Sequence, residues 1–276
     1  MPCFSVSAHS WSRHRLRLFL LSGLCLVVLA SVSPQYAAAQ NNSSTSDDAN
    51  DAADGAGVAG RYKWNANHDP NGIGKFYMGR EIAHVMGFAG ALWLERDTRE
   101  EEERLTLLVK SLKIQPGDVV ADIGAGSGVI SMLMSEPVLP DGYIIAVDVQ
   151  DEMLLRLQQN ARNKGVKNIV PVKGTQKSSS LAPQSIDLAI MVDVYHEFEF
   201  PYEMMLDISK ALKPGGRVAL VEYRKEDPTV PIKLVHKMTE KQAKREVEQP
   251  EFDLKWTETI GVLPQQHIIV FTKQGR

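Results

Sequence analysis

A glycine-rich stretch near the middle of the chain has the residue types and spacing of a cofactor-binding turn. The apolar residues 119–123 include Asp122, and glycines follow at positions 124, 126 and 128. The apolar run predicts a short buried strand, and the residues after Gly128 have the apolar spacing of a helix. Glycines between a strand and a helix let a ligand approach the backbone, and the free N–H groups at the helix start face that ligand. The stretch therefore predicts a nucleotide-like cofactor site at the carboxyl end of the first strand of a doubly wound sheet.

The spacing of the glycines distinguishes two kinds of cofactor. The dinucleotide fingerprint G-x-G-x-x-G needs glycine or alanine at position 129, where Val129 stands. The order here is instead D-x-G-x-G-x-G. This pattern resembles motif I of the class I S-adenosylmethionine (SAM) methyltransferases, in which the glycine loop wraps the methionine half of the cofactor. The resemblance implies SAM as the cofactor and assigns contacts with it to Asp122, Gly124, Ala125, Gly126 and Gly128.

The ends of three further predicted strands carry candidate cofactor residues. Residues 143–147 lead to Asp148 and Val149, where a carboxylate can bind the two hydroxyls of a ribose. Residues 169–172 lead to Gly174 and Thr175. The resembled family often has an acid at this last position that contacts the adenine amino group, so Thr175 or Gln176 would have to supply that contact here. Residues 186–192 lead to Asp193, which we also assign to the cofactor site.

The residues after Asp193 are the best candidates for catalysis. Methyl transfer from a sulfonium is an in-line displacement, so an enzyme must align acceptor and methyl group and sometimes remove a proton from the acceptor. His196 is the predicted base, because imidazole titrates near neutral pH and the loops at strand ends carry chemistry in this architecture. We expect Tyr195 to orient the acceptor and Glu197 to polarise His196 or to act as the base itself. The alternative is that this Tyr-His-Glu run only ends the strand.

Other titratable residues are weaker candidates. Glu222, after the fifth predicted strand, is expected on the opposite wall of the same crevice as a hydrogen-bonded structural carboxylate. His236 and His267 are less favoured, and His267 is interpreted as structural because it lies beside an alternating strand pattern. Two histidines at ligand spacing do not occur on any one predicted element, so we expect no metal site.

The elements that position these residues predict an α/β fold. Helical segments separate the strands, and the L-K-P-G-G turn at 212–216 is a recurrent mark of the methyltransferase fold. Residues 266–273 are expected to form the antiparallel final strand, and a Thr239/Gln242 capping box begins a helix over 239–248. The acid run 100–103 is interpreted as the solvated start of an amphipathic helix. We therefore expect a doubly wound, mostly parallel, seven-stranded sheet as the SAM-dependent domain, residues 98–276.

Residues 61–97 are expected to form an N-terminal helical cap over that domain. Apolar positions 78, 82, 85 and 86 share one helical face. The stretch Y-M-G-R-E-I-A at 77–83 resembles one in uncharacterised bacterial methyltransferase-like proteins, including exported members. We hypothesise that Tyr77 and Arg80 line the acceptor site; the alternative is a surface ion pair between Arg80 and Glu81.

The N-terminus predicts export. Three arginines between positions 13 and 17 precede the apolar residues 18–32 and three alanines at 37–39. This order is typical of a secretory signal peptide, residues 1–39, and an uncleaved segment would anchor the domain outside the membrane. Residues 40–60 are rich in Asn, Ser, Asp, Ala and Gly and predict a disordered linker. Both cysteines, Cys3 and Cys25, precede residue 39, so the mature chain is expected to have no disulfide.

The net charge of the chain argues against one class of methyl acceptor, nucleic acid. The net charge of −3 provides no electrostatic footprint for nucleic acid. We therefore expect a small-molecule acceptor, such as a quinone, lipid or phenolic, in line with a general resemblance to the C- and O-methyltransferases of quinone biosynthesis. Two alternatives stay open: a nicotinamide-dependent oxidoreductase, which would share Asp148, and a non-catalytic SAM-type binding protein, which would not need His196.

Overall fold

The computed structural model describes residues 60–275. The predicted signal peptide, 1–39, lies outside the described residues, as does the predicted linker up to residue 59. Across the described part of the chain, no helix combines the length and apolar character needed to span a membrane.

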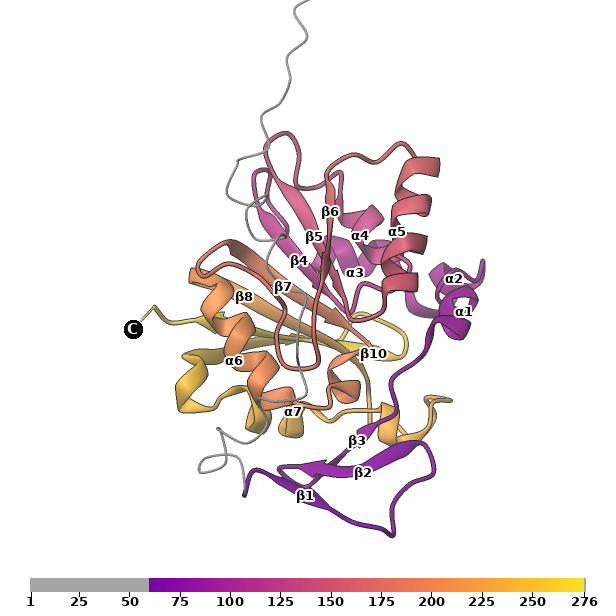
Figure 1. Cartoon of the computed structure of the whole chain (residues 1–276), viewed down its shortest axis with the longest axis vertical. Helices are drawn as coiled ribbons and strands as arrows, with labels where there is room; N and C mark the ends of the chain where they lie inside the picture. Colours follow the sequence, from indigo (N-terminus) through magenta and orange to yellow (C-terminus); the bar gives the residue numbers. More distant parts are fainter. Residues whose placement is uncertain (1–59, 276) are drawn as a thin grey trace, which may run out of the picture. The chain divides into compact units, whose positions relative to one another are not determined.

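A seven-stranded sheet forms the centre of the domain (Figure 1). Strands β6, β5, β4, β7 and β8 are parallel, whereas β10 runs antiparallel to β8 and β9 runs antiparallel to β10. The doubly wound, mostly parallel prediction is therefore confirmed, including the antiparallel final strand. In spatial order the strands are β6 (Ile169–Lys173), β5 (Tyr143–Asp148), β4 (Val119–Ile123), β7 (Ile186–Val192), β8 (Leu212–Tyr223), β10 (Gln266–Lys273) and β9 (Leu254–Ile260).

The chain reverses its winding direction between β4 and β7. From β4 the next strands, β5 and β6, are added on one side, and β7 and β8 are added on the other. In open α/β sheets a crevice opens outside the carboxyl ends of the strands at such a switch point. The loops that carry the predicted site residues therefore meet there.

Helices cover the sheet and close its core. Figure 1 shows α3, α4 and α5 on one side of the sheet and α6 and α7 on the other. Leu108 of α3 and Met134 of α4 pack with Val120 and Ile144 in one fully buried cluster. Each such side chain contributes about 1.5–3 kcal/mol of hydrophobic stabilisation. The helices are α3 (Leu105–Ser111), α4 (Val129–Met134), α5 (Asp151–Asn163), α6 (Pro201–Ala211) and α7 (Glu240–Val247), and the short 3₁₀ turns are η2 (Tyr195–Glu197), η3 (Leu234–His236) and η4 (Pro250–Phe252).

The predicted start of α7 is confirmed. The hydroxyl of Thr239 accepts a hydrogen bond of 3.0 Å from the backbone N–H of Gln242. The side chain of Gln242 does not return to Thr239; it donates instead to the carbonyl oxygen of Met78 at 3.2 Å and to Glu246 at 2.7 Å. The capping residue is thus as predicted, and its partner ties α7 to the N-terminal segment.

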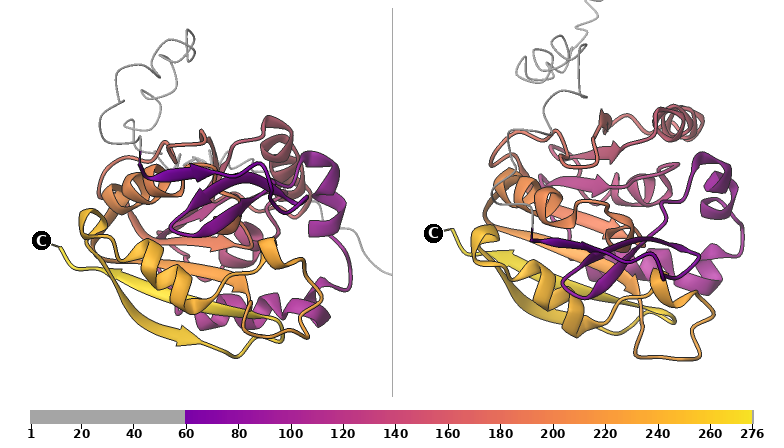
Figure 2. Two further views of the ribbon diagram at one scale, coloured as in Figure 1. Left: turned by 90° about the horizontal axis from the view of Figure 1, so that it is seen from below. Right: turned by 60° about the horizontal axis from the view of Figure 1, so that its bottom comes forward.

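The N-terminal cap is a sheet, and the prediction of a helical cap is wrong. Strands β1 (Tyr62–Trp64), β2 (Gly72–Tyr77) and β3 (Arg80–Ala83) pair antiparallel. Met78 and Gly79 have φ of 49° and 91°, the left-handed backbone of a two-residue hairpin turn, which no right-handed helix can contain. Only η1 (Phe88–Gly90) and α1 (Ala91–Leu94) are helical between residues 60 and 97. Figure 2 shows this small sheet in indigo, and its strand β3 contacts η2 and η3.

The acid run is largely exposed at the start of a helix, as predicted, except at its last residue, Glu103, which is buried. Residues Arg99–Glu103 form a short helix, α2, which a left-handed residue, Arg104, with φ of 56°, separates from α3. Glu103 is only 1% exposed and pairs with Arg99 at 2.9 Å. The spacing of the apolar residues correctly predicted α3. It does not predict that Glu103, in the short helix α2 before it, is buried.

Candidate functional site

The glycine turn after β4 is closely packed on both sides. Gly124, Gly126 and Gly128 all have positive φ, of 73°, 53° and 82°. A Cβ atom on Gly126 would lie 2.6 Å from Cδ1 of Leu94 in α1, and one on Gly128 would lie 2.6 Å from Cγ of Leu157 in α5. The turn therefore excludes side chains and keeps its backbone accessible to a ligand.

Asp148, at the end of β5, is tied to this turn. Its Oδ2 accepts a hydrogen bond of 2.8 Å from the N–H of Gly126, and its Oδ1 accepts one of 2.8 Å from the N–H of Gln150. Burial raises the pKa of Asp148, while these N–H groups act to lower it. The carboxylate is held by backbone donors and borders the crevice, as a ribose-binding acid must.

A cavity of about 570 Å³ occupies the crevice outside the carboxyl ends of β4, β5 and β7. It brings most of the predicted site residues together. The predicted residues that line it are Gly124, Gly126, Asp148, Val149, Thr175, Asp193, His196 and Glu197.

Four predicted site residues do not reach the cavity: Asp122, Ala125, Gly128 and Tyr195. Asp122 accepts a hydrogen bond of 2.6 Å from the hydroxyl of Ser131 in α4, and burial raises its pKa to about 6. Tyr195 is fully buried and packs edge-on against Phe198. The predicted role of Tyr195 in orienting the acceptor therefore gains no support from the geometry.

Several cavity residues were not predicted. Arg99 and Glu103 of α2, and Trp93 and Leu94 of α1, line the wall next to the glycine turn. Tyr223, at the end of β8, lines the same wall. Its hydroxyl donates a hydrogen bond of 3.1 Å to Glu103. No local motif marks these residues, since only the folding of α1 and α2 over the sheet brings them to the cavity.

Asp193 and Thr175 differ in whether their side-chain oxygens already have hydrogen-bond partners. Asp193 accepts a hydrogen bond of 2.7 Å from Gln266 through Oδ2, while its buried Oδ1 has no hydrogen-bond partner in residues 60–275. Burial, together with the charges of Glu103 and Glu222, raises the pKa of Asp193. The hydroxyl of Thr175 accepts from the N–H groups of Lys177 and Ser178, at 3.2 and 3.0 Å.

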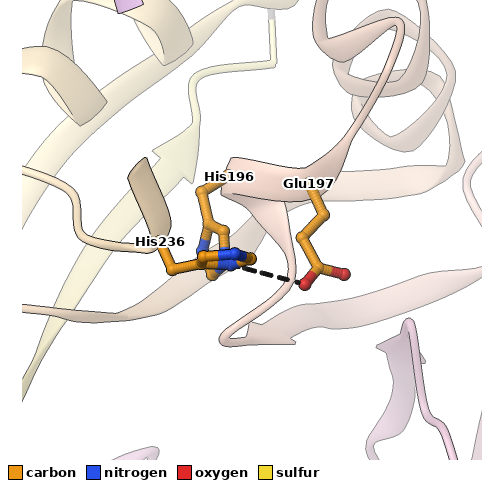
Figure 3. A group of neighbouring side chains, drawn as sticks. All are labelled: His196, Glu197 and His236. Atoms are coloured by element: carbon orange, nitrogen blue, oxygen red, sulfur yellow. Dashed lines mark hydrogen bonds and ion pairs between the residues drawn. The ribbon is translucent and has the colours of Figure 1, made fainter. Parts of the chain in front are cut away.

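His196 is the centre of a buried polar cluster (Figure 3). Its Nδ1 lies 2.6 Å from Oε2 of Glu222, and its Nε2 lies 3.1 Å from Nδ1 of His236. Burial alone would lower the pKa of His196, but the charge and hydrogen bond of Glu222 outweigh burial and raise it. Burial and the neighbouring His196 lower the pKa of His236 to about 4.

Glu222 is a hydrogen-bonded carboxylate, as expected, with His196 as its partner, although it does not line the cavity. The less favoured His236 is in the same cluster. Against the expectation that there is no metal constellation, ligand atoms of His196, Glu197 and His236 lie within 4.8 Å of one another, close enough to hold a metal ion. The spacing argument considered single elements, whereas η2 and η3 bring these side chains together from positions forty residues apart in the sequence.

Arg80 and Tyr77 take structural positions. The guanidinium of Arg80 is buried, binds Glu246 through hydrogen bonds of 2.8 and 2.9 Å, and donates a third, of 3.0 Å, to the carbonyl oxygen of His196. Tyr77 is 2% exposed and borders a second cavity, between the N-terminal sheet and η4. Neither residue lines the cavity of the glycine turn, and the alternative partner Glu81 instead pairs with His68.

This sheet order and glycine turn define an α/β protein that binds a nucleotide-like cofactor. The family model described as a methyltransferase domain matches residues 114–266, more than half of the chain. The chain belongs to the class I SAM-dependent methyltransferases, and SAM is its cofactor. The residues fit SAM, because Asp148 suits a ribose and the buried Oδ1 of Asp193, which has no partner in residues 60–275, suits an ammonium group.

Individual relatives agree with this assignment. The chain is 29% identical over 113 residues to arsenite methyltransferase of Halobacterium salinarum and 31% identical over 131 residues to the uncharacterised methyltransferase YcgJ of Bacillus subtilis. These matches cover 41% and 47% of this chain, and the chain spans only 29% and 51% of the length of the two relatives. Among solved structures, a SAM-dependent methyltransferase from Aquifex aeolicus shares the fold, with a TM-score of 0.64 and 20% identity over 68% of this chain and 100% of that one.

Proposed function

We propose that the protein transfers the methyl group of SAM to a small-molecule acceptor and that His196 takes the acceptor's proton. One observation carries the proposal: Nδ1 of His196 lies 2.6 Å from Oε2 of the fully buried Glu222. A carboxylate at Nδ1 holds the proton on that nitrogen and leaves the lone pair of the ring on Nε2. His196 lines the cavity, and its Nε2 faces Nδ1 of His236 at 3.1 Å.

The residues around His196 would each have a separate role in the reaction. When bound, SAM supplies a methyl group on a sulfonium, a leaving group that needs no acid. Glu222 orients His196 and stabilises the imidazolium that forms when Nε2 takes a proton. Glu197 lies 3.9 Å from Nε2 and contributes a second negative charge rather than the orienting hydrogen bond. An acceptor reaches Nε2 by displacing the ring of His236, whose side chain is 25% exposed.

The lining of the cavity favours an apolar acceptor that carries an acidic hydroxyl or ring carbon. Phe198, Met204 and Ile232 are among the apolar side chains that line the cavity together with His196. Such a wall suits a phenol or quinol, and relatives at 24% identity include the ubiquinone/menaquinone biosynthesis C-methyltransferase UbiE of Wigglesworthia glossinidia brevipalpis. A base at Nε2 serves either O-methylation or C-methylation. With a net charge of −3, we do not propose a nucleic-acid acceptor.

The test is an acceptor screen with the full chain. SAM is incubated with phenols, quinols and catechols, and S-adenosylhomocysteine is measured by mass spectrometry. For any acceptor found, His196→Ala should lower turnover by at least about a hundredfold with SAM affinity unchanged. His68→Ala, in the loop between β1 and β2, is the matched histidine control and should leave both unchanged. Equal turnover in His196→Ala would overturn the assignment of the base, and SAM binding without any transfer would favour a non-catalytic binding protein.

We also propose that the domain is exported. The support is the order of basic, apolar and small residues before position 40.

A further inference from the structure

The side chains of His196, His236 and Glu197 converge on one point in the cavity wall (Figure 3). Nε2 of His196 is 3.1 Å from Nδ1 of His236, and Oε1 of Glu197 is 3.9 Å and 3.7 Å from these two nitrogens. The centre of this triangle lies about 2.1 Å from each corner, which is the length of a zinc–nitrogen or zinc–oxygen bond. We propose that these three residues form a binding site for a divalent transition-metal ion, for which Zn²⁺ is the best fit.

The atoms of the cluster are arranged as ligands rather than as a closed hydrogen-bond network. Oε1 of Glu197 lies too far from either histidine nitrogen for a hydrogen bond. The two facing nitrogens can share at most one proton between them, and a metal ion replaces that proton by binding both lone pairs. The three atoms therefore surround a shared centre.

Neighbouring groups hold each ligand in the orientation that a metal requires. Glu222 accepts from Nδ1–H of His196 and so leaves Nε2 as the ligand atom, the carboxylate–histidine arrangement found behind metal sites. Glu197 accepts a hydrogen bond of 3.2 Å from the N–H of Met86 through Oε2, which leaves Oε1 directed at the histidines. Two of the three ligands thus have a fixed second partner.

The donor set selects the class of ion. Two imidazoles and one glutamate are the ligands of catalytic zinc sites, which keep one position open. Mg²⁺ and Ca²⁺ prefer all-oxygen surroundings and fit this set poorly. All three residues line the cavity, so the open coordination position faces the space where we place the acceptor. An acceptor with an oxygen donor would complete the coordination.

The inference goes beyond the proposed function and does not depend on it, because zinc binding requires no SAM. It has one consequence for that function: Nε2 of His196 cannot hold a zinc ion and accept a proton at once. In the zinc-loaded protein the ion, rather than His196, would increase the acidity of a bound hydroxyl, and the proton would pass to water.

The experiment is a metal titration of the full chain after treatment with a chelator. Zn²⁺ binding is measured by calorimetry, and Co²⁺ is added as a probe because its visible absorption reports the coordination number. We expect one strong site in the wild-type chain and affinity at least about tenfold lower in His236→Ala and in Glu197→Gln. Glu197→Gln is nearly isosteric and can still accept from Met86. His68→Ala should bind as the wild type does.

The controls separate the possible failures. His9 and His14 are present in every variant, so differences between variants report the cluster alone. If His236→Ala does not fold, as judged by near-ultraviolet circular dichroism, His236→Asn replaces it. Equal zinc affinity in the wild type and the His236 variant, or no zinc binding by the wild type, would overturn the metal site. SAM affinity is measured on the same samples, so loss of the metal site alone leaves the proposed methyl transfer standing.

Discussion

Arg80 donates a hydrogen bond of 3.0 Å from Nη1 to the carbonyl oxygen of His196. This bond joins β3 of the N-terminal sheet to the turn that carries the proposed base. The same guanidinium is held in place by two hydrogen bonds to Glu246 of α7. The N-terminal sheet therefore acts on the site through the backbone of His196 rather than by lining the cavity.

Removing Arg80 should destabilise the protein strongly. Arg80→Ala leaves the carboxylate of Glu246, which is fully buried, without its cation, and we expect a loss of about 3–5 kcal/mol in the free energy of unfolding. Urea denaturation measures the change. Lys113→Ala breaks an exposed ion pair with Glu258 and should cost less than about 1 kcal/mol. Similar losses in both variants would contradict a structural role of Arg80.

Glu222 should matter for turnover and not for cofactor binding. Glu222→Gln removes the charge that stabilises the imidazolium of His196, so we expect kcat to fall by at least about a hundredfold at unchanged SAM affinity. Because the two residues act as a unit, the double variant Glu222→Gln/His196→Ala should be little worse than His196→Ala alone. Fully additive losses would show that Glu222 acts independently of His196.

Gly126 should be needed for SAM binding. An alanine there would carry φ of 53° and place its Cβ 2.6 Å from Leu94, so the loop or α1 must move. We expect SAM affinity to fall at least about tenfold, measured by calorimetry. Gly165→Ala is the matched control, with a positive φ of 70° and no atom within 4 Å of the added Cβ. It should cost about 1 kcal/mol of stability and leave SAM affinity unchanged.

Asp122 should lower stability as its carboxyl ionises. Burial raises its pKa to about 6, so between pH 4 and 6 the native state holds the proton more tightly than the unfolded chain does. Stability from this group is therefore fully present below about pH 4 and is lost as the pH rises through 6, by roughly 3 kcal/mol at pH 7. Asp122→Asn keeps an acceptor for Ser131 and should be more stable than the wild type at pH 7 but not at pH 4. Denaturation curves measure the stability difference between the variant and the wild type. An equal difference at pH 4 and pH 7 would show that the pKa of Asp122 is not raised.

Export is tested by N-terminal sequencing and fractionation. The full chain is expressed in a Gram-negative host, and the periplasmic fraction is collected. We expect the mature chain to begin at Gln40, which follows Ala39. An intact N-terminus in the cytosolic fraction would show that residues 1–39 do not direct export.

The local sequence pattern alone predicted the sheet and most of the cofactor loop. Strand periodicity located β4, β5, β6, β7 and β10, and the alternating glycines predicted the turn between β4 and α4, in which all three glycines have positive φ. These features depend on neighbours in sequence, such as apolar runs and residues without a Cβ atom. The amphipathic residues of α3 and the cap at Thr239 were predicted for the same reason.

Tertiary structure decided how the site is assembled. His236 and Glu103 reach the cavity from separate elements, and nothing in their local sequence reports that convergence. Glu222 was expected near the crevice, but only the fold shows that it binds His196. The N-terminal segment was misjudged because apolar residues at 78, 82 and 85 satisfy a helical period, while the left-handed Met78–Gly79 turn turns the chain into a hairpin. The amino-acid sequence therefore determined the fold and the kind of cofactor, whereas long-range packing determined which side chains share the buried, low-dielectric space around His196.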